Sequence, residues 1–279
     1  MRKLLGAALS MLGALAVVAA IATAQTAVPV VAVTASPTSI SAGATGPIAA
    51  GPTTFQINRS ASRTGLNVYI ATLNAGVTLQ DLQAAFRRDD RTQGGGSSLG
   101  LASVHASVSL SGSEVRRNVS LTLKPGLTYV LVSEPDADNA PPSRGIGTFT
   151  TSGQANGATA PQPNATVRME DLAFRGSATL PRRGIVRVQN FGAGPHIAIA
   201  FPLRRGVTNA QAGRAIRSGS DAAFGRIAGG QPTVLQNILS GGGNFNDQQV
   251  SFARAGRYAL VCFFNEHNRL GMYRVVTVR

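Results

Sequence analysis

Residues 258–272 read YALVCFFNEHNRLGM and join a β-strand pattern to three residue types that bind metal ions. Tyr258, Leu260 and Cys262 alternate with the residues between them, and this period of two predicts a strand. His267 and Met272 follow at equal steps, so the segment has the spacing C-x4-H-x4-M. A thiol, an imidazole and a thioether at this spacing predict a site for a soft metal ion.

This segment resembles the ligand loop of the cupredoxins, the family of plastocyanin, azurin and rusticyanin, and its two gaps of four residues are similar to the rusticyanin type. Upstream, residues 190–196 (NFGAGPH) resemble the cupredoxin segment in which the first histidine ligand follows a strand and a Gly/Pro turn. Residues 168–174 and 184–190 resemble the opening strands of that family. The resemblance spans nearly all of residues 167–279 and implies one type 1 (blue) copper ion bound by His196, Cys262, His267 and Met272. It also implies a protein that carries electrons or copper in the cell envelope.

Such a ligand set suits copper because one ion must be held in both the Cu(I) and the Cu(II) state. A soft thiolate, two imidazoles and a weak thioether accept both states with little change in geometry, which favours fast electron transfer. Five residues fully extended span about 17 Å, so the loop must fold back sharply for its three ligands to meet at one ion. Asn265, Asn268 and Gly271 are residues that tolerate such turns.

Other interpretations of the same residues are open. Cys262 fits a small core residue, Met272 fits a gap filler in the core, and His267 fits a loop residue in solvent. In the familiar cupredoxins the residue after the first histidine is usually Asn or Ser, but Ile197 stands there in this chain. The alternative hypothesis is therefore a copper-free cupredoxin-fold binding or structural module, with a basic face for an acidic partner.

The start of the chain has the pattern of an export signal. Arg2 and Lys3 are basic, residues 4–21 are apolar, and residues 22–24 (ATA) are small. We therefore expect a signal peptide over residues 1–24 and a periplasmic or secreted location, with an uncleaved anchor as the alternative. No later segment is apolar enough to span a membrane, and the single cysteine cannot form an intramolecular disulfide.

The rest of the sequence divides into two related halves. Residues 25–52 and 152–166 are rich in Ala, Thr, Ser, Gly and Pro and are expected to be flexible linkers. Residues 53–151 and 167–279 align on a shared Gly-Val-Thr step that begins a helix N-cap pattern, at 76–78 and 206–208. Short alternating runs and frequent glycines predict an all-β protein. Together with the alignment, the resemblance of the second half implies two cupredoxin-like Greek-key β-sandwich domains, each with a short helix.

The alignment leaves the first half without metal ligands. The positions of His196, Cys262 and Met272 are occupied there by Leu66, Ser133 and Ile146. The segment opposite the remaining ligand, residues 134–143, contains no histidine. The first half is therefore predicted to be a degenerate copy without metal that supports or docks the copper domain.

The net charge of +14 is carried mainly by the second half, where residues 168–279 hold 15 arginines against five acidic residues. The positive electrostatic field of this half favours an acidic redox protein as partner and speeds the encounter with it. Nucleic acid is not expected as a partner, because the arginines are scattered and have few aromatic neighbours. An apolar rim for docking is expected around the ligands, formed by Pro195, Phe263, Phe264 and Leu270.

An enzyme is not expected. A copper oxidase or nitrite reductase needs further histidines for a second copper centre, and His105 is the only histidine of the three that is not already assigned. His105 lies on the polar side of an alternating strand over residues 103–110 and is expected to be solvated. The Gly-rich stretches lack the Lys-Ser/Thr that a phosphate-binding loop requires, so no nucleotide site is expected.

Overall fold

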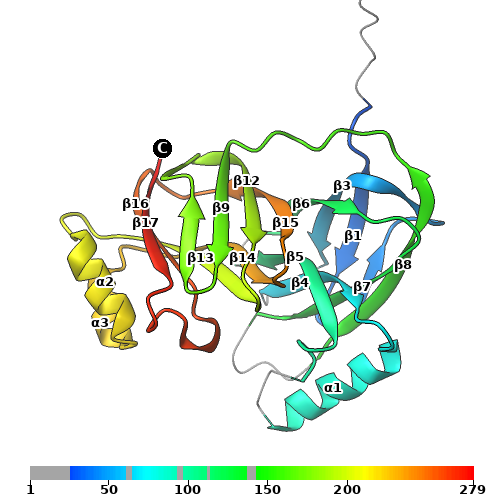
Figure 1. Cartoon of the computed structure of the whole chain (residues 1–279), viewed down its shortest axis with the longest axis horizontal. Coiled ribbons are helices and arrows are strands. Elements are labelled where there is room, and N and C mark those ends of the chain that lie inside the picture. Colours follow the sequence, from blue (N-terminus) through cyan, green and yellow to red (C-terminus); the bar gives the residue numbers. More distant parts are fainter. Residues whose placement is uncertain (1–25, 61–64, 93–96, 112–113, 137–142) are drawn as a thin grey trace, which may run out of the picture.

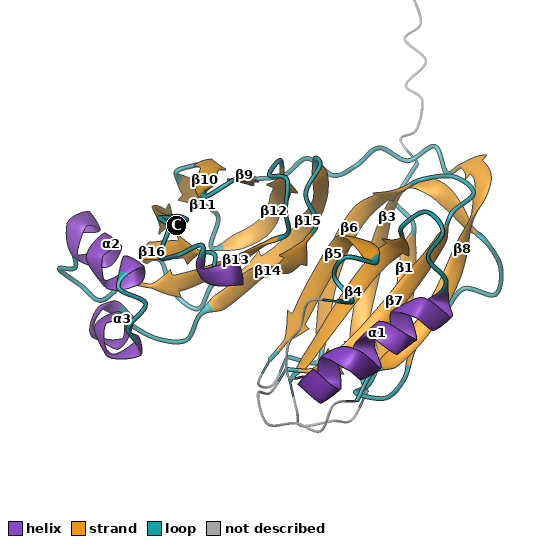
Figure 2. Ribbon diagram, turned by 60° about the horizontal axis from the view of Figure 1, so that its bottom comes forward, coloured by secondary structure: helices purple, strands orange, loops and turns teal. Residues whose placement is uncertain are grey.

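The computed structural model describes residues 26–60, 65–92, 97–111, 114–136 and 143–279, which form mainly β-strands (Figure 1 and Figure 2). The expected signal peptide lies outside the described residues. The elements of the first half are β1 (Val30–Ala35), β2 (Ile40–Ala42), β3 (Ile48–Arg59), β4 (Leu66–Leu73), α1 (Leu79–Thr92), β5 (Ala102–Leu110), β6 (Arg116–Leu123), β7 (Thr128–Pro135) and β8 (Gly145–Ala155). Those of the second half are β9 (Ala165–Glu170), β10 (Ala173–Gly176), β11 (Thr179–Leu180), β12 (Arg183–Asn190), β13 (His196–Pro202), α2 (Asn209–Arg217), α3 (Asp221–Ile227), β14 (Thr233–Leu239), β15 (Asn244–Ser251), β16 (Gly256–Val261), the 3-10 helix η1 (Phe264–Glu266) and β17 (Tyr273–Val278).

Both halves repeat one order of strand pairing. Each half has two layers of strands. In the first layer of the first half, β1 pairs antiparallel with β2 and parallel with β3, and β3 pairs antiparallel with β6. The second half has the same pairings among β9, β10, β12 and β15. The second layers also correspond, because the order β8-β7-β4-β5 in the first half matches β17-β16-β13-β14 in the second. The protein is therefore all-β and consists of two β-sandwich repeats, as the sequence predicted.

A flexible linker was expected over residues 25–52, but residues 26–52 are ordered, so this prediction was wrong. They contain β1, β2 and the start of β3, and Val33 and Ala35 are fully buried. Residues 30–35 extend the first layer by pairing with β3, which satisfies their backbone hydrogen-bonding groups. Small residues are common both in linkers and in this strand, so composition did not separate the two.

The connection between the repeats is shorter than the linker expected over residues 152–166. β8 continues to Ala155 and β9 begins at Ala165, which leaves residues 156–164 between them. The start of this connection is anchored, because the side-chain amide of Asn156 donates to the carbonyl of Pro52 at 2.8 Å.

Each repeat carries helical structure on the outer face of its second layer. Leu82 of α1 packs against Val130 of β7, and Ile216 of α2 packs against Val261 of β16. α1 follows β4 in the first repeat, and α2 follows β13 at the corresponding place in the second repeat. None of the helices within the described ranges is long and apolar enough to cross a membrane.

The predicted helix starts are confirmed. In α2, Thr208 and Gln211 form a capping box in which each side chain accepts from the other residue's backbone N–H. Before α1, the Asp81 carboxylate accepts from the Thr78 N–H at 2.9 Å, and the Thr78 hydroxyl accepts from the Asp81 N–H at 3.2 Å. These bonds satisfy backbone amides that a helix start leaves free.

The buried apolar residues form separate clusters in the two repeats. The largest cluster of the second repeat lies between its two layers and includes Cys262 and Met272. The largest cluster of the first repeat contains Phe55, Phe149 and Tyr129, whose rings are in contact. Each repeat therefore has its own hydrophobic core.

The repeats meet through buried polar side chains. β15 pairs with β6, which joins the two first layers. Because β3 also pairs with β8, the second layer of the first repeat belongs to the same 12-stranded sheet. Beside the pairing of β15 with β6, the fully buried Gln236 donates to the Ser107 hydroxyl at 2.8 Å and accepts from Asn246 at 2.9 Å and from Gln248 at 3.0 Å. Of these bonds, the one to Ser107 crosses between the repeats, and because a buried polar group without a partner costs free energy, it favours one relative position of the repeats.

His105 lies in this contact and is not solvated, so that expectation was wrong. Its Nε2 atom lies 2.9 Å from the Thr72 hydroxyl, and its Nδ1 atom lies 2.9 Å from the side-chain oxygen of Asn244 in the second repeat. Burial lowers the pKa of His105, while the contact with Asn244 opposes this shift. The strand face is polar as predicted, but the second repeat covers it.

Replacing Gln236 by alanine is expected to lower the free energy of unfolding by about 1–3 kcal/mol, because it removes hydrogen bonds from buried partners. Gln249→Ala, at an exposed position of β15, is the matched control and is expected to change stability by less than about 0.5 kcal/mol. Chemical denaturation measures both values. A Gln236→Ala protein as stable as the control would show that this polar contact does not stabilise the fold.

Candidate metal centre

The predicted ligands lie at one end of the second layer of the second repeat, where β13, β16 and β17 are neighbours (Figure 1). Val261, the last residue of β16, pairs with β13 on one side and with β17 on the other. His196 starts β13, Cys262 directly follows β16, and Met272 directly precedes β17. The strand register therefore brings these three residues to the same end of the sheet.

His196, Cys262 and His267 bring their donor atoms together. The Cys262 sulfur lies 3.8 Å from His196 Nδ1 and 3.6 Å from His267 Nδ1, and the two Nδ1 atoms are 3.1 Å apart. The donor atoms of the three residues all lie within 4.8 Å of one another. His196 and Cys262 are buried, whereas His267 is half-buried. Three of the four predicted ligand side chains thus form one cluster.

This donor set fits a copper ion. Imidazole nitrogens and thiolate sulfurs lie about 2.0–2.1 Å and about 2.3 Å from a bound zinc ion, and copper is of similar size. Donor atoms 3.1–3.8 Å apart can therefore reach a single ion. Two imidazoles with one thiolate are the strong ligands of type 1 copper sites. Within the described ranges, no other group of His, Cys, Asp and Glu donors comes together in this way.

Met272 adjoins the cluster through its backbone. Its N–H donates to the His267 carbonyl at 2.9 Å, and its carbonyl accepts from the Cys262 N–H at 3.2 Å. Its side chain is fully buried and belongs to the same apolar cluster as Cys262. The fourth predicted ligand is thus hydrogen-bonded through its backbone to two of the other three.

The ligand loop, residues 262–272, folds back through left-handed backbone positions. Asn265 has a φ of 44°, Glu266 of 60° and Gly271 of 105°. Asn265 and Gly271 were predicted as turn residues, and this is confirmed. Glu266 was not predicted, because a glutamate gives no sign of a left-handed conformation in the sequence.

Asn268 lies in a turn, as expected, because its carbonyl accepts from the Gly271 N–H at 3.2 Å, and its side chain makes a further contact. It is buried, and its side-chain amide donates to the carbonyl of Ile216 in α2 at 3.0 Å. Nearby, the ring of Phe263 contacts Phe224 of α3 at a centroid distance of 5.8 Å and Phe201 of β13 at 5.7 Å. The loop is therefore tied to both the sheet and the helices.

The residues of the expected apolar rim lie in different environments. The Phe264 ring packs edge-on to His267 at 5.8 Å and faces a cavity toward the first repeat. Leu270 is 65% exposed, and Pro195 is half-buried. Exposed apolar surface beside the ligands thus comes mainly from Leu270 and the exposed part of Phe263.

The Cys262 sulfur accepts a hydrogen bond from the backbone. The Ile197 N–H donates to it at 3.5 Å. Burial raises the pKa of the Cys262 thiol, while the N–H groups of Ile197 and Phe264 lower it. Ile197 differs from the Asn or Ser of familiar cupredoxins in its side chain, but its backbone contacts the ligand sulfur.

Burial lowers the pKa of both imidazoles of the cluster. The neighbouring His267 lowers the pKa of His196 further, and Asp171 opposes the shift in both rings. Because both values lie below the ordinary 6.5, both rings are mainly neutral at neutral pH. Neutral imidazole is the form that binds a metal ion.

Asp171 is a residue of the site that the sequence did not indicate. Its Oδ1 atom lies 3.6 Å from His196 Nε2, a buried nitrogen without a hydrogen-bond partner among the described residues. The Ala193 N–H donates to the same carboxylate oxygen at 3.0 Å and holds it there. A carboxylate beside Nε2 favours the tautomer in which Nε2 carries the proton and Nδ1 is free to bind a metal ion.

At the corresponding positions of the first repeat, the side chains are of other types than the predicted ligands. Leu66 starts β4 as His196 starts β13, and it is fully buried. The buried Ser133 hydroxyl donates to the carbonyl of Ser36 at 2.7 Å, and Ile146 packs with the cluster under α1. The segment opposite His267 lies largely outside the described residues.

No family model and no curated protein sequence matches the chain. Similar solved structures include auracyanin B, with 20% identity and a TM-score of 0.28 over 43% of this chain and 93% of that one. Auracyanin A, a blue copper protein from Chloroflexus aurantiacus, has 22% identity and a TM-score of 0.24 over 41% and 96%. A copper nitrite reductase from Nitrosomonas europaea has 12% identity and a TM-score of 0.25 over 90% and 94%. The fold assignment rests on the strand pairings described above.

Gly192→Ala is expected to disturb the contact between Asp171 and His196. A Cβ atom there would lie 2.5 Å from Asp171 Oδ1 and 2.6 Å from His196 Nε2, so one group must move. We expect a loss of stability of about 1–3 kcal/mol and shifted His196 ring resonances in NMR spectra of the metal-free protein. Gly194→Ala, whose Cβ would meet no atom within 4 Å, is the control in the same loop. Unchanged resonances in Gly192→Ala would contradict the geometry described for Asp171.

Proposed function

We propose that the protein is an electron carrier with one type 1 copper ion, held by His196, Cys262, His267 and Met272. The observation that supports this most directly is the gathering of one thiol and two imidazole donors within 4.8 Å at the end of a β-sandwich. Copper in such a set supplies one-electron transfer, because its two oxidation states need little change in geometry. Met272 is proposed as the weak fourth ligand, on its place in the loop.

The protein holds the strong donors in position through its own contacts. His196 and Cys262 are buried at the ends of paired strands, and the loop that carries His267 is tied to α2 at Asn268. Donors fixed in this way rearrange little when the charge at the site changes. His267 is the only one of the proposed ligands that is half-buried rather than buried, so we propose its imidazole edge as the route by which electrons leave.

The proposal is for a carrier rather than an enzyme. A catalytic second copper centre would need further imidazoles, and the chain has three histidines in all. The third, His105, has both ring nitrogens engaged with Thr72 and Asn244. These contacts favour a structural role for His105 at the junction of the repeats.

We also propose that the protein is exported, on the pattern of residues 1–24. An acidic redox protein of the same compartment is proposed as its partner, because the second repeat carries most of the positive charge.

The copper-loaded, oxidised protein is expected to be blue, and the thiolate-to-copper charge-transfer band is expected to disappear in Cys262→Ser and in His267→Ala. Met272→Leu is the matched control: it is expected to keep the band and to raise the reduction potential, because a weak fourth ligand tunes the site rather than forming it. Visible absorption and voltammetry measure these effects.

A band retained in Cys262→Ser would refute the ligand assignment. A folded wild-type protein that binds neither Cu(I) nor Cu(II) would instead support the alternative function, a copper-free binding module with a basic face for an acidic partner.

The first repeat is expected to bind no copper, so metal analysis of the full chain should find one copper ion per molecule. The triple variant His196→Ala/Cys262→Ser/His267→Ala should retain none, while circular dichroism confirms that it is folded. Two ions per wild-type molecule, or one in the triple variant, would place a copper site outside the proposed centre.

A further inference from the structure

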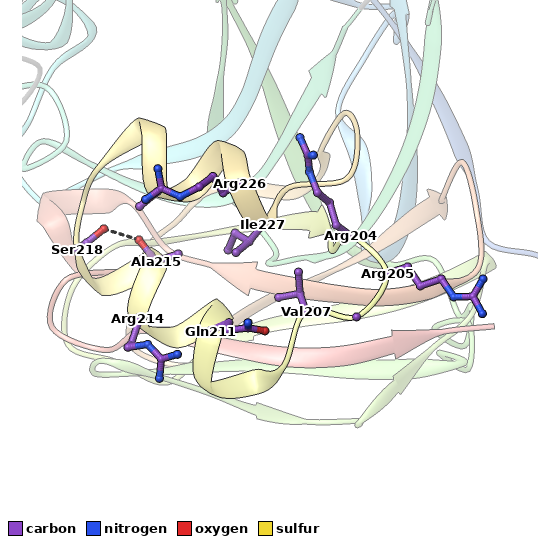
Figure 3. Close-up of a pocket in the computed structure, with 11 residues that line it drawn as sticks. Arg204, Arg205, Val207, Gln211, Arg214, Ala215, Ser218, Arg226 and Ile227 are labelled. Carbon is purple, nitrogen blue, oxygen red and sulfur yellow. Dashed lines mark hydrogen bonds between the residues drawn. The ribbon is translucent and has the colours of Figure 1, made fainter.

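A pocket of about 650 Å³ opens beside α2 and α3, and four arginines line it: Arg204, Arg205, Arg214 and Arg226 (Figure 3). We call it the arginine pocket. Its inner surface includes the buried side chain of Ile227 and the half-buried side chain of Val207. All four arginines are exposed, and no acidic residue lines the pocket. The pocket therefore has a positively charged rim, formed by the four arginines, and an apolar floor, formed by Ile227 and Val207.

The charge of this rim is not neutralised within the part of the chain that the structure describes. None of the four arginines is in an ion pair there, whereas Arg187 and Arg269 elsewhere in the same repeat pair with Asp247 and Glu266. Four of the 15 arginines of the second repeat thus place unneutralised positive charge around this one pocket.

Two guanidinium groups at the pocket are held by backbone carbonyls. Arg204 donates to the carbonyls of Ala228 at 2.9 Å and Gly225 at 3.2 Å. Arg254, in a hollow that shares Arg204 and Arg205 with the pocket, donates to the carbonyl of Gly229 at 3.0 Å. Carbonyls fix the position of these groups but do not remove their net charge, so the charges remain available to an anionic partner.

The arrangement of the rim indicates the kind of occupant. Figure 3 shows the arginines spread around Ile227 and Val207, with Arg205 and Arg214 on opposite sides. Separated guanidinium groups suit several negative charges along an extended molecule better than one small anion. The apolar floor suits an aliphatic side chain between those charges, which an acidic polysaccharide does not carry.

We propose that the arginine pocket binds an acidic segment of a partner protein, with glutamate or aspartate side chains on the rim and an aliphatic side chain on the floor. The pocket is close to the metal centre: Ala215 lines it, and the next residue, Ile216, accepts the hydrogen bond from Asn268 of the ligand loop. A partner seated there lies about one helix diameter, some 10–12 Å, from that loop. Only the identification of this partner as the redox partner rests on the proposed function.

The test uses the full-length, metal-free protein and a fluorescent synthetic peptide of glutamates with two leucines, measured by anisotropy. Arg204→Gln/Arg226→Gln is expected to weaken binding about 2- to 30-fold, the range for two exposed ion pairs. A peptide with serine in place of leucine should bind more weakly than the original. Raising the salt concentration should weaken binding of the original peptide.

Arg87→Gln/Arg91→Gln removes the same charge from exposed positions of α1 and is the matched control. Arg205→Gln/Arg214→Gln is a second test variant, in case Arg204 is needed for folding. Equal peptide binding by the test and control variants would overturn the proposal. So would equal binding of the leucine and serine peptides, or arginine-dependent binding of alginate or anionic vesicles without binding of the peptide. Because no metal is present, none of these outcomes depends on the copper site.

Discussion

The backbone hydrogen bonds among β13, β16 and β17 are the constraint on which the candidate metal centre depends. β16 is paired on both sides, and its residues 258–261 each have a defined neighbour in both adjacent strands. A slip of one residue would turn every side chain of a strand to the opposite face of the sheet. The pairing of Val261 with Ile199 and Tyr273 therefore determines where Cys262 meets the strand of His196 and the start of β17. The ligand positions follow from this register, and contacts among the ligands are its result.

The same architecture does not create the same chemistry in the first repeat. β4 and β7 pair there as β13 and β16 do, but Leu66 and Ser133 occupy the equivalent places. One of these side chains fills apolar volume and the other donates to a neighbouring carbonyl. A sandwich end is thus a position where a site can form, and the side chains decide whether donors, packing or hydrogen bonds are found there.

Local patterns in the sequence were enough for the all-β class and the helix starts, because each depends on period or spacing within a short segment. The grouping of His196 with Cys262 and His267, which lie more than 60 residues further along the chain, came from the resemblance of both segments to the cupredoxins. The missed features depend on what lies across space. Asp171 reaches His196 from a different hairpin, and nothing in the residues around it marks that contact. The alternation around His105 correctly separates a polar from an apolar face, but it cannot tell water from a polar neighbour. Residues 30–35 form a strand rather than a flexible linker because they pair with β3.

The pairing of β6 with β15 has a consequence for how the molecule behaves among its own copies. Each of these strands is the last in its layer, so in a solitary repeat it would be an edge with unpaired N–H and C=O groups. Open edges recruit strands from other chains and promote aggregation. By turning these two edges toward each other, the chain covers part of both, at the pairs Asp247–Ser120 and Gln248–Val119. The first repeat can therefore reduce the exposure of its neighbour's edge to other chains, whatever it contributes to metal binding.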